Sequence, residues 1–147
     1  MIFAVCRLDS LLVDAYEIVE RAPTVDEFRR LRGPAGGGEV SDEGLAAGLA
    51  SALYSCVVLH NGEVVACGRV IGDGGMYFYV QDVIVLPEYS GRGLGVKVMD
   101  AVVAYLQRVA RPGAFVGLMD ADNAEGFYER YGFQRRPDDG TGMFRVW

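Results

Sequence analysis

The chain of 147 residues has little of what several kinds of chemistry require. It contains one histidine, His60, and three cysteines, Cys6, Cys56 and Cys67, without a CxxC pair. This supply is too small for the His and Cys ligand clusters of a zinc site, so we expect no metal. An odd number of cysteines fits a reducing compartment, and we expect a cytoplasmic protein with inert, packed thiols. His60 precedes a predicted turn, where we expect an exposed residue rather than a base.

Long apolar runs and an excess of basic residues are also missing. No run approaches the roughly 18 residues of a membrane-spanning helix. The apolar opening 1–6 has no basic flank, so it predicts an accessory strand over 1–8 rather than a secretory signal. The 14 Lys and Arg residues stand against 20 Asp and Glu, a net charge of −6. Because nucleic-acid binding depends on neutralising phosphates with Lys and Arg, we expect neither a nucleic acid nor a membrane as partner.

What the chain has is enough apolar sequence for one core. Hydrophobic residues make up 51% of it, and no repeat or linker divides it. We therefore expect a single domain over 1–147. The stretch 92–111 carries four basic residues against one acid. Local basic charge in an acidic protein indicates an anionic ligand beside a cationic one, although scattered solvated charge is the alternative.

Hydrophobic periodicity predicts alternating strands and helices. A capping box, Thr24 to Glu27, opens a short helix, and a second begins at Ser41 with Leu45, Leu49 and Leu53 on one face. Further helices are expected over 123–131 and over 93–111, the latter with an apolar stripe of Leu94, Val98, Val102, Leu106 and Val109. Strands are expected over 16–20, 54–60, 63–71, 76–86, 114–118 and 143–146.

The turns and the crossover helix define the fold class. Asn61-Gly62 is a favoured hairpin pair, because both positions of that turn need positive φ. The strand, helix, strand order over 76–118 is typical of a βαβ unit with parallel strands. We predict an α/β (α+β) fold with a mixed, mostly antiparallel sheet and helices on both faces.

The turn at 90–95, Ser-Gly-Arg-Gly-Leu-Gly, is the most informative segment. Gly91, Gly93 and Gly95 let the backbone approach a ligand, and successive N–H groups before a helix suit a pyrophosphate. A Walker loop would need Gly-Lys-Ser/Thr, and a dinucleotide fingerprint would need glycine at position 96, where valine stands. A purely structural turn is the alternative.

Two segments carry a resemblance to a known family. The run 82–95, Asp-Val-Ile-Val-Leu-Pro-Glu-Tyr-Ser-Gly-Arg-Gly-Leu-Gly, resembles the cofactor motif of the GCN5-related N-acetyltransferases (GNAT). The run 123–133, Asn-Ala-Glu-Gly-Phe-Tyr-Glu-Arg-Tyr-Gly-Phe, is similar to that family's second hallmark. The resemblance implies a central pair of parallel strands that splay apart, with acetyl-CoA as co-substrate. Ser90 departs from the family, which usually has Gln or Arg there.

The resemblance also implies which residues form the site. The coenzyme A pyrophosphate would lie on backbone amides of Gly91, Arg92, Gly93, Leu94, Gly95 and Val96. The pantetheine arm would pair with Val83 and Val85, and Asn123 would lie near it. Tyr128 would protonate the departing thiolate, with a place in the helix core as the alternative.

The general base stays open at this point. Gln81 stands where sugar-amine members of the family often have Glu, and Gln cannot take a proton. Asp82, Asp120 or a water chain could accept it instead. Asp82 could equally be a buried hydrogen-bonding residue.

We therefore expect an enzyme that transfers acetyl from acetyl-CoA to a primary amine of a small-molecule acceptor. The alternative is a non-catalytic acyl-CoA sensor or partner-binding domain. The loop 33–38, rich in glycine, is interpreted as a flap over the acceptor or as a spacer. The terminal strands 1–8 and 143–147 are edge candidates through which we expect a homodimer.

Overall fold

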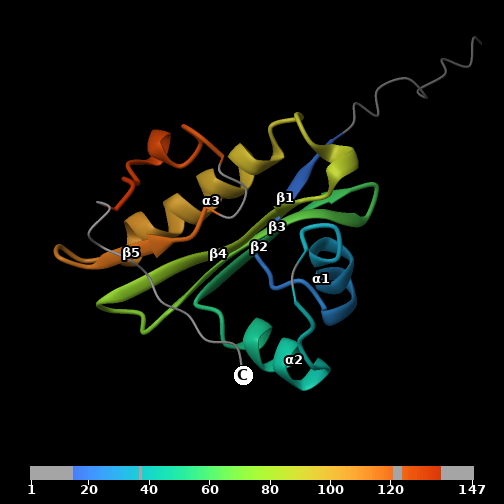
Figure 1. Cartoon of the computed structure of the whole chain (residues 1–147), viewed down its shortest axis with the longest axis horizontal. Helices are drawn as coiled ribbons and strands as arrows, with labels where there is room; N and C mark the ends of the chain where they lie inside the picture. Colours follow the sequence, from blue (N-terminus) through green and yellow to red (C-terminus); the bar gives the residue numbers. More distant parts are fainter. Residues whose placement is uncertain (1–14, 37, 121–123, 137–147) are drawn as a thin grey trace, which may run out of the picture.

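The computed structural model describes residues 15–36, 38–120 and 124–136, and the structural statements below concern these residues. Their strands form one five-stranded sheet in the order β1-β2-β3-β4-β5 (Figure 1). The strands are β1 (Glu17–Val19), β2 (Tyr54–His60), β3 (Glu63–Gly72), β4 (Tyr77–Val85) and β5 (Phe115–Leu118). The helices are α1 (Val25–Arg32), α2 (Asp42–Ala50), α3 (Leu94–Val109) and the 3₁₀ turns η1 (Pro87–Tyr89) and η2 (Glu129–Tyr131).

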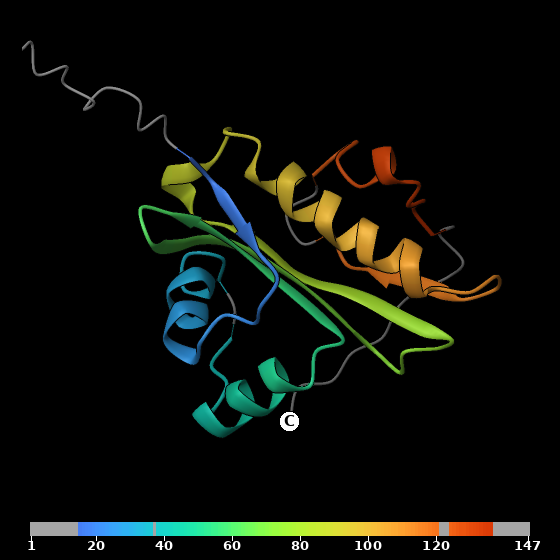
Figure 2. The ribbon, with the colours of Figure 1, turned by 180° about the vertical axis from the view of Figure 1, so that it is seen from behind.

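Helices cover both faces of this sheet. Helix α3 packs across β2, β3 and β4 on one face, while α1 contacts β3 and β4 on the other, with α2 beside it (Figures 1 and 2). Neighbouring strands are antiparallel from β1 to β4, and β5 runs parallel to β4 after the α3 crossover. The predicted fold class, a mixed and mostly antiparallel sheet with helices on both faces, is therefore confirmed.

Local sequence signals explain most element boundaries. Asn61 and Gly62 have φ of 50° and 81°, as the predicted hairpin turn requires. The capping box is present: Thr24 Oγ1 accepts from the Glu27 amide at 3.2 Å, and Glu27 Oε2 accepts from the Thr24 amide at 2.8 Å. Glu27 also accepts from Arg21 at 2.7 and 2.9 Å, and this pairing lowers the pKa of the Glu27 carboxyl.

Two predicted helical features are wrong. Helix α2 buries Leu45 and Leu49 but ends at Ala50, so Leu53 lies beyond the helix that was expected to carry it. The helix expected over 123–131 is, from residue 124 on, a series of turns followed by η2. Gly126 has φ of +76°, which is left-handed, and an α-helix cannot continue through that conformation. The expected strands 1–8 and 143–146 lie outside the described residues.

The core occupies both faces of the sheet, and its part under α3 shows how closely helix and strands pack. Val98 and Val102 of the predicted apolar stripe are fully buried, and Met99 of the same helix is fully buried beside them. They approach β3 at Gly68, where a Cβ would collide with Val98 Cγ1 and touch Val102 Cγ2 at 3.4 Å. The missing side chain at position 68 therefore sets how closely the helix approaches the strands.

We expect Gly68→Ala to lower the free energy of unfolding by about 1–3 kcal/mol, the usual effect of overfilling a packed core. Gly48→Ala is the matched control, because a Cβ at Gly48 on α2 meets nothing within 4 Å. That change should raise stability by up to about 1 kcal/mol through helix propensity. Urea unfolding of both variants checks the pair, and equal effects would contradict the close approach at Gly68.

Candidate active site

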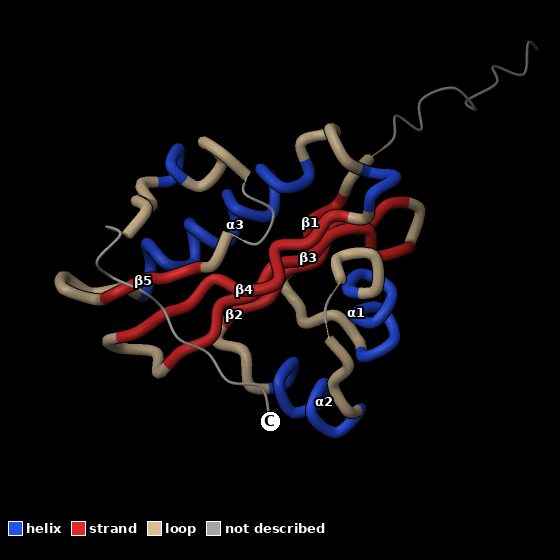
Figure 3. The backbone as a smooth tube through the Cα atoms, in the orientation of Figure 1, coloured by secondary structure: helices blue, strands red, loops and turns tan. Residues whose placement is uncertain are grey.

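The strand β4 has one edge that its neighbours leave open. It pairs with β5 only from Tyr77 to Val80, so the two parallel strands part beyond that point (Figure 3). The Leu86 amide donates to the Val65 carbonyl on β3 at 2.9 Å. Because successive backbone groups of a strand alternate sides, those of Val85 and Val83 face away from β3, toward the open edge. Backbone donors and acceptors are thus available to an extended ligand.

A β-bulge in β4 lies at the start of this open edge. Cys67 pairs with Ile84, whereas Arg69 pairs with Gln81, so β4 has one more residue than β3 at this point. Asp82 lies in the bulge with φ of +52°. Its carboxylate accepts from Arg69 Nε at 2.8 Å, and Arg69 Nη2 lies 2.7 Å from the same oxygen. Asp82 is thus a nearly buried, ion-paired residue.

The glycine turn follows β4 and η1 and leads into α3. Gly91 and Gly93 have φ of 75° and 79°, and no atom lies within 4 Å of a Cβ built at either position. The N-cap of the 16-residue α3 is Gly93, which has no side chain to bond the first amides of the helix. Open amides at a helix N-terminus attract an anion. Leu94 is buried beneath the turn and anchors it to the core.

Gly95 has a different role from the other two glycines. A Cβ there would lie 3.4 Å from the ring of Phe127. Phe127 in turn packs edge-to-face on Tyr128, with ring centroids 4.9 Å apart. The absence of a side chain at position 95 therefore lets the segment that carries Tyr128 pack closely on the start of α3.

Arg92 extends from the glycine turn toward an aromatic cluster. Its Nη1 donates to the Tyr16 hydroxyl at 2.8 Å, and its guanidinium lies 5.2 Å from the centroid of the Tyr89 ring. His60 stacks on Tyr16 at 4.8 Å, and its Nδ1 lies 3.2 Å from the Tyr89 hydroxyl. The expectation of an exposed turn histidine is wrong: His60 ends β2 and is half-buried in this cluster.

A cleft of about 580 Å³ lies beside the open edge of β4. Its walls come from β4, the end of β5, the loop after α1 and the segment near Tyr128. The cleft is lined by Leu31, Arg32, Pro34, Ala35, Gly36, Val80, Gln81, Asp82, Val83, Ile84, Val85, Pro87, Ser90, Leu118, Met119, Asp120, Ala124 and Tyr128. The structure thus brings the predicted Tyr128, Asp82, Val83 and Val85 together, and it places the loop after α1 on the facing wall.

Asp120 is the second carboxylate of the cleft. Its Oδ1 accepts from the Ala124 amide at 2.9 Å, and its Oδ2 lies 3.6 Å from Arg135 Nη2. These contacts tie the end of β5 to the segment that carries Tyr128. Asn123, the predicted neighbour of the pantetheine arm, lies outside the described residues.

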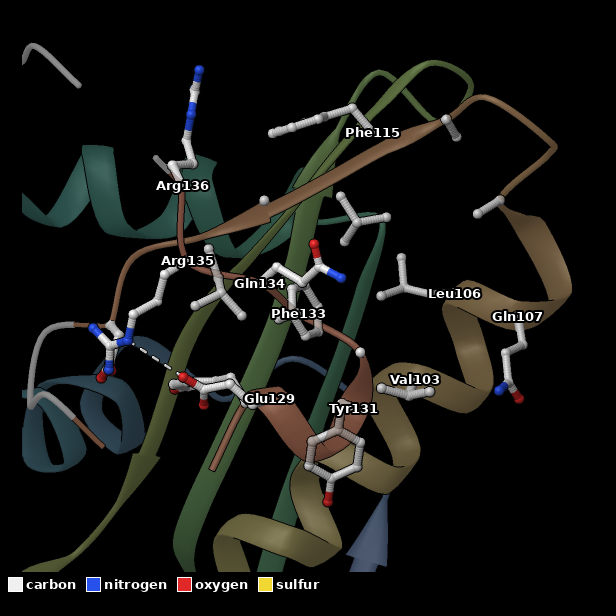
Figure 4. Close-up of a pocket in the computed structure, with 18 residues that line it drawn as sticks. Val103, Leu106, Gln107, Phe115, Glu129, Tyr131, Phe133, Gln134, Arg135 and Arg136 are labelled. Carbon is white, nitrogen blue, oxygen red and sulfur yellow. Dashed lines mark ion pairs between the residues drawn. The ribbon is translucent and has the colours of Figure 1, made fainter. Parts of the chain in front are cut away.

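A larger cavity of about 990 Å³ lies between the C-terminal half of α3, β5 and residues 128–136. Val103 and Leu106 form its apolar side, and Arg135 lies at the other side, ion-paired with Glu129 (Figure 4). Tyr128 and Asp120 line this cavity and the smaller cleft alike. Tyr131 lines the larger cavity but not the smaller cleft, and its hydroxyl donates to Asp100 at 3.0 Å.

The thiols of Cys56 and Cys67 are packed in the core and do not line the cleft. Cys56 and Cys67 are fully buried. Burial raises the pKa of the Cys56 thiol to about 11 and also raises that of Cys67. Within residues 15–36, 38–120 and 124–136, no group of His, Cys, Asp or Glu side chains could hold a metal ion. In the same part of the chain, no helix is both long and apolar enough to cross a membrane.

Known proteins resemble this chain in sequence. The acetyltransferase (GNAT) domain family matches residues 51–135, and the chain belongs to that family. Serotonin N-acetyltransferase 2, chloroplastic, of Oryza sativa subsp. japonica is 38% identical over 82 residues, 56% of this chain and 40% of that protein. An uncharacterized N-acetyltransferase, ycf52, of Pyropia yezoensis is 29% identical over 57% of this chain and 47% of its own. The chain thus spans less than half the length of these relatives.

Solved structures agree with the family. A probable acetyltransferase from meticillin-resistant Staphylococcus aureus superposes with a TM-score of 0.85 at 28% identity, covering 90% of this chain and 100% of that one. A GNAT acetyltransferase from Streptococcus pneumoniae has a TM-score of 0.74 at 27% identity, covering 90% and 98%. The resemblance noted in the sequence is confirmed.

Proposed function

We propose that this protein transfers an acetyl group from acetyl-CoA to a primary amine of a small molecule. One observation carries the proposal: the open edge of β4 leads directly into a glycine turn at the N-terminus of α3, with Tyr128 beside the same cleft. An extended, amide-containing arm that ends in a pyrophosphate matches this arrangement. Coenzyme A has that chemistry, and an aminoglycoside N-acetyltransferase of the same fold is known in complex with it.

The residues divide between binding and proton transfer. Backbone groups of Val83 and Val85 bind the arm, and amides from Gly91 to Val96 bind the phosphates, with Arg92 adding positive charge beside them. Asn123, which lies outside the described residues, is proposed as a further contact to the arm. When bound, acetyl-CoA supplies the thioester that the amine attacks in a ternary complex. Holding both reactants in one cleft replaces a bimolecular encounter with an aligned attack.

Two protons have to move during this transfer. Tyr128 donates its hydroxyl proton to the departing sulfur and so acts as the general acid. The proton of the attacking amine passes to Asp120, the carboxylate of the cleft whose arginine partner is largely exposed, or to water; Asp82 in the same cleft is ion-paired with the nearly buried Arg69. The acidic balance of the chain favours a cationic acceptor.

Calorimetric titration with acetyl-CoA, followed by thiol release with a panel of amines, tests the proposal. The panel contains serotonin, glucosamine 6-phosphate, an aminoglycoside and spermidine, because named relatives act on the first three kinds. Binding with amine-dependent release supports the transferase. Binding without release favours a non-catalytic acyl-CoA sensor. Absence of binding would reject the assignment of the glycine turn.

Tyr128→Phe should lower turnover at least about tenfold, within the range of general acid catalysis, and leave the acetyl-CoA Kd unchanged. Tyr131→Phe is the matched control. It removes a hydroxyl from the same segment, but one that bonds Asp100 and does not line the cleft. Steady-state kinetics of both variants check the prediction, and equal turnover in the two would remove Tyr128 from the acid role.

Gly93→Val should abolish acetyl-CoA binding, because the side chain would occupy the concavity and strain a left-handed residue. Gly113→Val is its control: Gly113 has φ of +87°, equally open surroundings, and a place just beyond the opposite end of α3. Both variants should lose similar stability, but only Gly113→Val should still bind in calorimetry. Intact binding by Gly93→Val would contradict the phosphate turn.

A further inference from the structure

Arg69 occupies a buried position that the reaction outlined above does not use. It bonds Asp82 on β4 through Nε and Nη2, and its Nη1 donates to the Gly48 carbonyl on α2 at 2.9 Å. Its guanidinium also lies 5.6 Å from the centroid of the Phe28 ring on α1. Only 12% of the Arg69 side chain and 9% of the Asp82 side chain are exposed. One guanidinium therefore links both helices of this face to the bulge of β4.

The backbone at Asp82 needs such a partner. Among the described residues, only Asn61 and Asp82 combine a side chain with positive φ, and Asn61 lies in a hairpin turn that favours it. Left-handed backbone within a strand costs free energy and persists where its surroundings hold it. Arg69 fixes the Asp82 carboxylate, while the Asp82 carbonyl accepts from Cys67 Sγ at 3.3 Å.

The bulge decides which backbone groups face the open edge. Because a strand alternates, removing the extra residue would turn the groups of Val83 and Val85 toward β3 and those of Ile84 outward. We propose that Arg69 is a positioning residue that, through Asp82, holds the bulge and so presents Val83 and Val85 to acetyl-CoA. Asp82 itself then acts in positioning and not as the general base. This inference rests on the proposed function, because its test measures the binding of acetyl-CoA.

The carboxylate geometry agrees with this role. Both contacts from Arg69 reach the same Asp82 oxygen, Oδ2, so that atom is engaged by a cation and unavailable to an incoming amine. Asp120, by contrast, holds Arg135 at 3.6 Å, and 58% of that arginine side chain is exposed. Under the proposal, proton removal passes to Asp120 or to water.

Four variants separate positioning from base catalysis. Asp82→Asn keeps an acceptor for Arg69 and a residue that tolerates left-handed backbone, but it cannot take a proton. Asp82→Gly keeps the conformation without the bond, and Asp82→Ala loses both. Adding Arg69→Met to Asp82→Asn removes the anchor without leaving a buried carboxylate unpaired.

We expect Asp82→Asn to keep its acetyl-CoA Kd and its turnover within about threefold of the wild type, with the same pH profile. Turnover is measured with the panel amine that releases most thiol. The Asp82→Ala variant and the Arg69→Met/Asp82→Asn double variant should bind acetyl-CoA about tenfold more weakly, the size expected for releasing one strained residue. Asp82→Gly should bind more tightly, and melt at a higher temperature, than Asp82→Ala.

Two results would overturn the inference. A loss of 100-fold or more in turnover for Asp82→Asn, at unchanged Kd, would make Asp82 the base. Wild-type affinity in both the Asp82→Ala variant and the double variant would show that the bulge needs no anchor. If the wild type does not bind acetyl-CoA, the proposed function fails separately. The order of melting temperatures, Asn above Gly above Ala at position 82, still tests the role of Arg69 in the bulge.

Discussion

Within the described residues, no strand pairs with the β5 side of β4 between Gln81 and Val85, and the candidate site is built around that edge. A strand edge in a soluble protein is usually covered, because unpaired amides and carbonyls invite other chains. Here the bulge at Asp82 and the short length of β5 leave it open toward a cleft. The open backbone is then a binding surface, with affinity from main-chain groups and selectivity from the side chains around it.

Features encoded by neighbouring residues were predictable from the sequence. The hairpin at Asn61-Gly62, the capping box of Thr24 and Glu27 and the apolar stripe of α3 all occur as expected. In each of them, successive residues of the pattern are at most four positions apart in the sequence, so the pattern can be recognised without the structure. The parallel β4 and β5 pair also followed from the order of elements. The assignment of individual site residues stays a prediction.

Features that depend on distant contacts were not predictable in this way. The positive φ of Asp82 depends on the register of β3 and on Arg69, 13 positions earlier. His60 joined an aromatic cluster because Tyr16 and Tyr89 come together only in the fold. The helix expected up to Tyr131 failed at Gly126, where the apolar spacing of the surrounding residues concealed a left-handed turn. One local sign was present: a glycine within an expected helix lowers its propensity.

The bond between Arg92 and the Tyr16 hydroxyl joins residues 76 positions apart. It connects the glycine turn to the segment that leads into β1, a strand of three residues at one edge of the sheet that the described residues form. A strand so short opens at little free-energy cost unless other contacts hold it. A ligand that immobilises Arg92 would therefore also slow the opening of β1, at the far edge of the sheet from β5. Amide exchange in β1 would then report occupancy of the glycine turn.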